Sequence, residues 1–175
     1  NDLHLGDNGH VWAATDAGAV RIVGVADYEL LSERDGIPVE KVTAVVEGPD
    51  GEFYFGNDGG GLTIYDGVRM RTLTTQDGLA GDRVTSLELT DDGQLWIGTH
   101  SGVSRYDGEV LSSFTQADGL PHPRVADVAV DGLGRTWMAT GGAGLAVLDD
   151  GRWSTIDSRD GLADDRVNAV VVGGD

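Results

Sequence analysis

Apolar residues occur along the chain in short runs that turn residues separate. In the clearest stretch these runs are Val84 to Leu89, Gln94 to Thr99, Val103 to Asp107 and Val110 to Thr115. Runs of this length are typical of β-strands. The chain contains no segment with helical spacing of apolar positions, so we expect groups of four consecutive antiparallel strands and no helix.

The same group of runs repeats about every 42 residues. One set of glycines recurs at intervals of 42, 42 and 41 residues, and an aromatic residue follows each by three: Gly9, Gly51, Gly93 and Gly134, then Trp12, Tyr54, Trp96 and Trp137. A second set of glycines recurs in the same way, and each of them directly follows an aspartate: Gly36, Gly78, Gly119 and Gly161. A valine lies six residues after each of these glycines: Val42, Val84, Val125 and Val167. We therefore predict repeats at 1–41, 42–83, 84–124 and 125–166, with 167–175 as the first strand of a further repeat.

Asp-Gly sequences predict tight hairpins between the strands. Asp91-Asp92-Gly93 lies between the first and second strands of the third repeat, and Asp107-Gly108 lies between its third and fourth. A glycine at these points suggests a backbone position with positive φ. Each repeat has a counterpart of the first turn, beginning with Asp7-Asn8-Gly9, while in the first repeat the second turn is reduced to Val23-Gly24-Val25.

Small residues beside the aromatic positions indicate how the repeats stack. Two residues beyond each aromatic, on the same face of the strand, lie Ala14, Gly56, Gly98 and Ala139. A large ring beside a small neighbour suits closely apposed sheets, and the first strand of each repeat is apolar on both faces. We predict an all-β fold, a β-propeller of four four-stranded blades of about 42 residues. The chain forms either a closed four-bladed ring or a segment of a larger propeller, whose edges would pair with further blades or with another copy.

The third repeat resembles a known family. The residues that carry the likeness are Arg83-Val84-Thr85-Ser86-Leu87, Asp92-Gly93-Gln94-Leu95-Trp96-Ile97-Gly98-Thr99, Gly102-Val103-Ser104-Arg105-Tyr106-Asp107-Gly108 and Asp118-Gly119-Leu120-Pro121. They resemble the two-component regulator propeller repeat. The resemblance implies the periplasmic or extracellular sensor portion of a hybrid histidine kinase, often one that reads oligosaccharides, although this chain contains no kinase or receiver segment. Thr90-x-Asp92-Gly93-x-x-Trp96 also resembles the Asp-box hairpin of sialidase-type propellers, which is structural there.

Charge and composition limit the kinds of partner that the chain can bind. The chain has 30 acidic and 12 basic residues and a formal charge of −18, which repels phosphate backbones and anionic lipids. We therefore expect no nucleic acid partner and no membrane insertion in this segment. The absence of cysteine excludes disulfides and thiolate chemistry.

One rim of the predicted propeller carries the candidate ligand-binding residues. A basic residue precedes the first strand of each following repeat: Lys41, Arg83, Arg124 and Arg166. Polar residues that lie in or near the neighbouring rim loops are Asp16, Asn57, Asp58, His100, Ser101 and His122. In one interpretation the cations form an arc that binds an anionic or polyhydroxylated ligand. In the alternative each cation pairs with the aspartate of its own loop, Asp35, Asp77, Asp118 or Asp160.

No pattern of catalytic, metal or cofactor residues emerges. The acidic pairs Asp91-Asp92, Asp149-Asp150 and Asp164-Asp165 lack the spacing of a calcium loop, and no helix follows the glycine clusters at 59–61 and 141–144. We predict a noncatalytic sensory module, with no cofactor, that binds a small polar ligand such as an oligosaccharide or a partner domain. The alternatives are a lyase-type propeller enzyme, which would use His100 or His122, and a protein–protein interaction scaffold.

Overall fold

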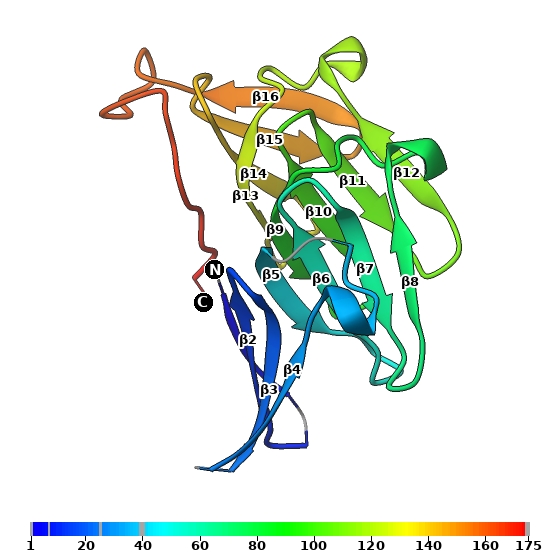
Figure 1. Ribbon diagram of the computed structural model, residues 1–175. Helices are drawn as coiled ribbons and strands as arrows, with labels where there is room; N and C mark the ends of the chain where they lie inside the picture. Colours follow the sequence, from blue (N-terminus) through cyan, green and yellow to red (C-terminus); the bar gives the residue numbers. More distant parts are fainter. Residues whose placement is uncertain (1, 7, 25, 39–40, 174–175) are drawn as a thin grey trace.

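The computed structural model describes residues 2–6, 8–24, 26–38 and 41–173, and these form four antiparallel sheets of four strands each (Figure 1). Blade 1 contains β1 (Leu3–Leu5), β2 (Val11–Thr15), β3 (Gly18–Gly24) and β4 (Asp27–Leu31), and blade 2 contains β5 (Val42–Glu47), β6 (Phe53–Asn57), β7 (Gly61–Tyr65) and β8 (Met70–Leu73). Blade 3 contains β9 (Val84–Leu89), β10 (Leu95–Thr99), β11 (Val103–Tyr106) and β12 (Leu111–Phe114), and blade 4 contains β13 (Val125–Val130), β14 (Thr136–Thr140), β15 (Leu145–Asp149) and β16 (Arg152–Ile156). The all-β propeller prediction is confirmed.

The strands of each blade follow one another in chain order because tight turns join them. The predicted hairpin glycines adopt positive φ: Gly9, Gly51, Gly93 and Gly134 have φ between 79° and 83°. This value belongs to the left-handed region, which a side chain disfavours. Two residues of the predicted turns of blade 1 lie outside the described residues: Asp7 of the first turn and Val25 of the second turn.

The prediction that no helical segment occurs is wrong at three short turns. Single 3₁₀ turns lie at Glu33–Asp35, Thr75–Asp77 and Gln116–Asp118, each between two blades. In the turn at 75–77, the Thr74 backbone N–H and hydroxyl both donate to the Asp77 carboxylate, at 2.9 and 3.1 Å. Such a capping box satisfies the first backbone groups of the turn locally. None of the three turns buries a residue, so they leave no apolar pattern in the sequence.

The blades pack face to face through the aromatic residue of the second strand. The Trp12 ring of blade 1 lies 4.2 Å from the Phe53 ring of blade 2, between ring centroids. Between blades 2 and 3 the small neighbour of the aromatic residue allows the close approach, because a Cβ placed on Gly56 would lie 2.6 Å from Val84 Cγ1 of blade 3. The aromatic residues Tyr54 and Trp96 pack in the same way between blades 2 and 3 and between blades 3 and 4. One apolar core therefore lies between each pair of neighbouring blades.

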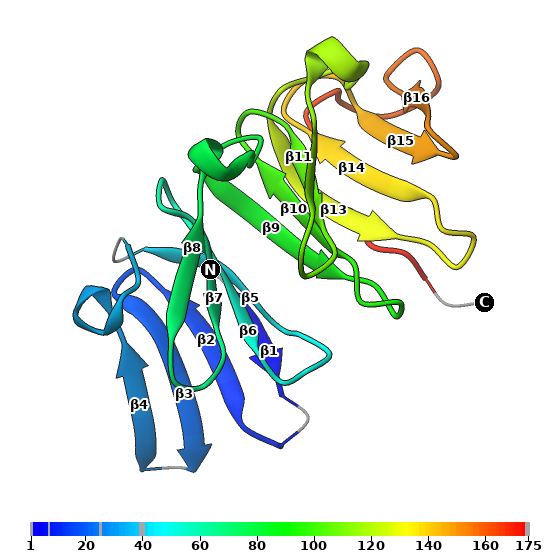
Figure 2. The same cartoon turned by 90° about the vertical axis from the view of Figure 1, so that its right-hand side faces the viewer.

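The blades fan out in an arc that stays open between blade 1 and blade 4 (Figure 2). The inner strands β1, β5, β9 and β13 lie along its concave side in chain order. Each blade has a forward face, which carries the aromatic residue, and a rear face on the opposite side. At the three interfaces the forward face of one blade packs against the rear face of the next. Among the described residues, no helix is long and apolar enough to span a membrane.

Candidate ligand-binding rim

A cavity of about 370 Å³ lies at one rim of the arc, between blades 2, 3 and 4. Lys41 and Arg83 reach it from the segments that precede β5 and β9, and Arg124 reaches it from the segment that precedes β13. Asp58 and His100 follow β6 and β10. The two kinds of segment meet because neighbouring strands are antiparallel, so the start of the first strand and the end of the second strand lie at the same end of the sheet. The rim therefore gathers residues that are far apart in the sequence.

Asp58 joins two of the cations. Its Oδ2 lies 3.1 Å from Lys41 Nζ and its Oδ1 lies 2.6 Å from Arg83 Nε. The hydrogen bond from Lys41 and the charge of Arg83 lower the pKa of Asp58 below its ordinary value. Because Lys41 precedes the first strand of blade 2 and Arg83 that of blade 3, the carboxylate links the two blades at the rim.

His100 lies among the same charges. Its backbone N–H donates to the Arg83 carbonyl at 3.1 Å. Burial lowers the pKa of His100, as do the charges of Arg124 and Arg83, whereas the Asp58 carboxylate acts in the opposite direction. The imidazole is therefore neutral at pH 7, and its ring can both donate and accept a hydrogen bond.

The cavity carries excess positive charge. Lys41, Arg83 and Arg124 contribute three positive charges against the single carboxylate of Asp58. Within the part of the chain that the structure describes, Arg124 makes no ion pair. A net charge of about +2 at this rim contrasts with the −18 of the whole chain.

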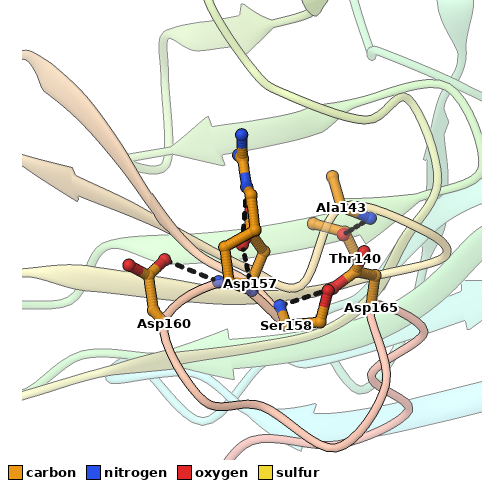
Figure 3. Close-up of polar contacts among 7 residues, drawn as sticks. Thr140, Ala143, Asp157, Ser158, Asp160 and Asp165 are labelled. Atoms are coloured by element: carbon orange, nitrogen blue, oxygen red, sulfur yellow. Dashed lines mark hydrogen bonds and ion pairs between the residues drawn. The ribbon is translucent and has the colours of Figure 1, made fainter.

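The alternative in which each cation pairs with the aspartate of its own loop is wrong. Asp35, Asp77 and Asp118 close the capping boxes of the 3₁₀ turns. Asp160 instead accepts the Asp157 backbone N–H at 3.1 Å, as Figure 3 shows. These carboxylates have local backbone donors within three residues, and Lys41 and Arg83 pair with Asp58 instead.

Several predicted rim residues do not line the cavity. Asn57 is fully buried, and its amide donates to the carbonyls of Phe55 and Gly61 and to the Thr63 hydroxyl. It supports the loop and has no access to a ligand. Ser101, His122 and Arg166 do not line the cavity either, and His122 Nδ1 accepts the Arg124 backbone N–H at 3.1 Å.

Three polar residues that line the cavity were not predicted from the sequence. Thr43 and Thr85 follow the regularly spaced valines Val42 and Val84, and Asn168 follows Val167. The Thr43 hydroxyl donates to Val84 O at 3.0 Å and the Thr85 hydroxyl donates to Val125 O at 2.8 Å. A polar residue directly after the repeated valine was the available signal.

A larger cavity of about 630 Å³ adjoins the rim on the concave side, and Thr43 and Thr85 line both. Its acidic residues are Asp2, Glu88 and Asp127. Burial raises the pKa of Glu88, and the neighbouring Asp127 adds to this effect. Across the described residues, no group of three or more His, Cys, Asp or Glu side chains could hold a metal ion.

Comparison with known proteins supports the family resemblance. The family model of the two component regulator propeller matches residues 78–101. The structure is similar to the extracellular domain of the hybrid two component system BT3049 from B. thetaiotaomicron, with a TM-score of 0.83 and 19% identity over 93% of this chain and 23% of that one. The extracellular domain of the one component system BT4673 from the same organism is similar with a TM-score of 0.74. Its sequence is 15% identical over 89% of this chain and 24% of that one.

A propeller enzyme is similar as well. Virginiamycin B lyase from Staphylococcus aureus matches with a TM-score of 0.69 and 17% identity, over 88% of this chain and 54% of that one. No curated protein matches the sequence significantly. The chain spans about a quarter of the length of these two extracellular domains. It is thus a β-propeller chain in which residues 78–101 match the two component regulator propeller repeat.

Proposed function

We propose that the chain is a noncatalytic, ligand-binding part of a periplasmic or extracellular receptor of the two-component type. The ligand is a small anionic, polyhydroxylated molecule such as an acidic oligosaccharide, and it binds at the rim cavity. The observation that carries the proposal is the cluster of Lys41, Arg83 and Arg124 around the single carboxylate of Asp58.

The chemistry of the cavity suits a carboxylated sugar. A guanidinium binds a carboxylate through two parallel hydrogen bonds, and Arg124 has no ion pair with the described residues that would compete. Asn168 and the neutral His100 ring supply donors and acceptors for hydroxyl groups. The strongly acidic remainder of the chain would repel an anion elsewhere, so binding concentrates at the rim.

The comparisons support a sensory role outside the cytoplasm. The two similar structures from B. thetaiotaomicron are extracellular domains of a hybrid two component system and a one component system. The match to the two component regulator propeller points in the same direction. A rim that binds ligand without changing it fits such a module.

A lyase activity is the second candidate, because the fold is also similar to that of virginiamycin B lyase. Here His100 would act as the proton-transferring group, since its imidazole lines the cavity and is neutral at pH 7. His122 is less suited, because its Nδ1 is occupied by the Arg124 backbone.

Calorimetric titration with a short oligogalacturonate tests the proposal, with a neutral oligosaccharide of equal length for comparison. We expect saturable binding of the acidic sugar alone. Arg124→Gln should weaken it about tenfold to a hundredfold, since a hydrogen bond to a charged group contributes about 1.5–3 kcal/mol. The control is Arg69→Gln, which removes an exposed cation from the β7–β8 turn. Equal binding of both sugars, or equal loss in both variants, would contradict the rim site.

Mass spectrometry of the same sugar after incubation separates the two candidates. A sensory module returns the oligosaccharide unchanged. An unsaturated product that forms with the original chain and disappears with His100→Ala, while the fold is retained, would establish the lyase instead.

A further inference from the structure

The rim position directly after the second strand holds a different residue in each of three blades. These residues are Asp58 in blade 2, His100 in blade 3 and Gly141 in blade 4. In each case the backbone N–H donates to the carbonyl of the cation that precedes the first strand of the same blade: to Lys41 at 3.1 Å, to Arg83 at 3.1 Å and to Arg124 at 3.0 Å. A side chain at this position therefore starts from the same place beside the rim cations, and the blades can be compared directly.

In blade 2 the side chain at this position bridges two cations. Asp58 Oδ2 lies 3.1 Å from Nζ of Lys41, the cation of its own blade. Its Oδ1 lies 2.6 Å from Nε of Arg83, the cation of the next blade. The protein thus supplies its own anion between blades 2 and 3, and an anion from solution would have to compete with it.

In blade 3 a histidine takes the place of this bridging carboxylate. Burial and the charges of Arg124 and Arg83 lower the pKa of His100, so both guanidinium groups act on the ring as the two cations of blade 2 act on Asp58. The neutral ring brings no negative charge to them. Arg83 reaches Asp58 through Nε, and its two Nη groups are further donors. Two cations therefore flank this position with no carboxylate between them.

Arg124 has no carboxylate at either of the positions that could supply one. Its own blade has Gly141, which carries no side chain, and the preceding blade offers His100. The residue directly before Arg124 is Pro123, whereas the same position one repeat earlier holds Asp82. Each of these differences removes a negative charge from the surroundings of Arg124, so the guanidinium is left for an anion from solution.

The missing side chain at Gly141 also determines where Arg124 lies. A Cβ placed on Gly141 would lie 3.0 Å from Arg124 Cδ and 3.2 Å from His122 Cε1, so these two side chains fill the space that a larger residue would need. The Arg124 backbone N–H donates to His122 Nδ1 at 3.1 Å. The stem of Arg124 is thus held before any ligand binds, which reduces the conformational entropy that binding costs.

We propose that one carboxylate of the ligand binds between Arg83 and Arg124, beside His100, where blade 2 has a carboxylate of its own. We call this place the His100 site. The inference rests on the ligand-binding rim proposed above and narrows its ligand to a sugar acid of which a single carboxylate is bound, because Asp58 fills the equivalent place between Lys41 and Arg83. His100 then determines specificity, since an aspartate at this position would close the site.

Two variants that each remove one cation from the cavity test where the carboxylate binds. In calorimetric titration with digalacturonate, Arg124→Gln should weaken binding about tenfold or more, whereas Lys41→Gln should weaken it at most about threefold, since Asp58 already neutralises Lys41. Equal losses, or a greater loss with Lys41→Gln, would place the carboxylate elsewhere in the cavity and overturn the proposal.

Partial esters of the same sugar test the number of carboxylates that are bound. One of the two monomethyl esters of digalacturonate should keep the affinity within about threefold, and the dimethyl ester should lose it. If both monomethyl esters bind more than about tenfold more weakly than the free diacid, two carboxylates are recognised and the single site is wrong.

Substitution of His100 tests the site with and without ligand. His100→Asp should weaken binding of digalacturonate about tenfold or more, while His100→Asn, which adds no charge, should weaken it at most about threefold. Without ligand, His100→Asp should have a higher Tm than His100→Asn, because the introduced carboxylate bridges Arg83 and Arg124. Adding Arg124→Gln should remove most of this difference. A Tm of His100→Asp that does not exceed that of His100→Asn would refute the equivalence with blade 2.

The outcomes separate this inference from the proposed function. If the unchanged chain binds no acidic sugar, the ligand-binding rim itself is wrong. If it binds digalacturonate and His100→Asp binds as tightly, the rim function stands and the His100 site is refuted. Circular dichroism of each variant shows that the blades are folded before affinities are compared.

Discussion

Single carboxylates set the geometry of the turns and of the rim. Asp131 Oδ1 accepts the backbone N–H groups of Leu133 and Arg135, and its Oδ2 accepts from Arg135 Nε and Trp137 Nε1. The bond from Trp137 contributes most to a pKa of about 2, so this carboxylate is charged at every physiological pH. Asp58 performs the related task between blades, because it holds cations of blades 2 and 3.

The titration of His100 measures the charge balance of the rim. We expect NMR to find its pKa below the ordinary value of 6.5. Arg124→Gln should raise the pKa, because a neighbouring positive charge disfavours the imidazolium, and Asp58→Asn should lower it further. Unchanged titration of His100 in both variants would contradict the described cluster.

At the scale of elements, strands were predictable and the turns between blades were not. The four strands of blade 3 begin and end within one residue of the predicted runs. Alternation and Asp-Gly turns are local signals, so the residues of one strand suffice to reveal them. The 3₁₀ turns depend on a hydrogen-bond exchange between a hydroxyl and a carboxylate three residues apart, which leaves no apolar period.

Two glycines that end these turns form a matched pair for mutation. Gly78 has φ 103° and open space where a Cβ would lie, whereas a Cβ on Gly119 at φ 105° would lie 2.6 Å from Trp153 Cδ1. Gly78→Ala should destabilise the fold by about 1 kcal/mol through its backbone angle alone. Gly119→Ala should cost at least about 2 kcal/mol, because crowding against the ring adds to the strain. Urea unfolding compares them, and equal losses would show that Trp153 does not pack there.

For the whole molecule, charge is the dominant property. The net charge of −18 makes the folded arc repel itself, and added salt screens this repulsion. Between about 0.02 M and about 0.3 M NaCl, we therefore expect the Tm to rise. The same salt should weaken binding of the acidic sugar, since rim cations are screened as well. A Tm that falls with salt would show that local ion pairs outweigh the overall repulsion.

The sequence by itself determined the repeat, the strands, the hairpin glycines and the propeller fold, because each depends on periodicity or on a residue's own backbone preference. Only the tertiary structure decided which side chains meet. It brought Lys41, Asp58 and Arg83 together and buried Asn57 inside the blade. It also placed the loop aspartates where they accept hydrogen bonds from nearby backbone N–H groups. The two ion pairs at the rim join residues that are 17 and 25 positions apart, and local pattern carries no information about which of several carboxylates a cation will reach.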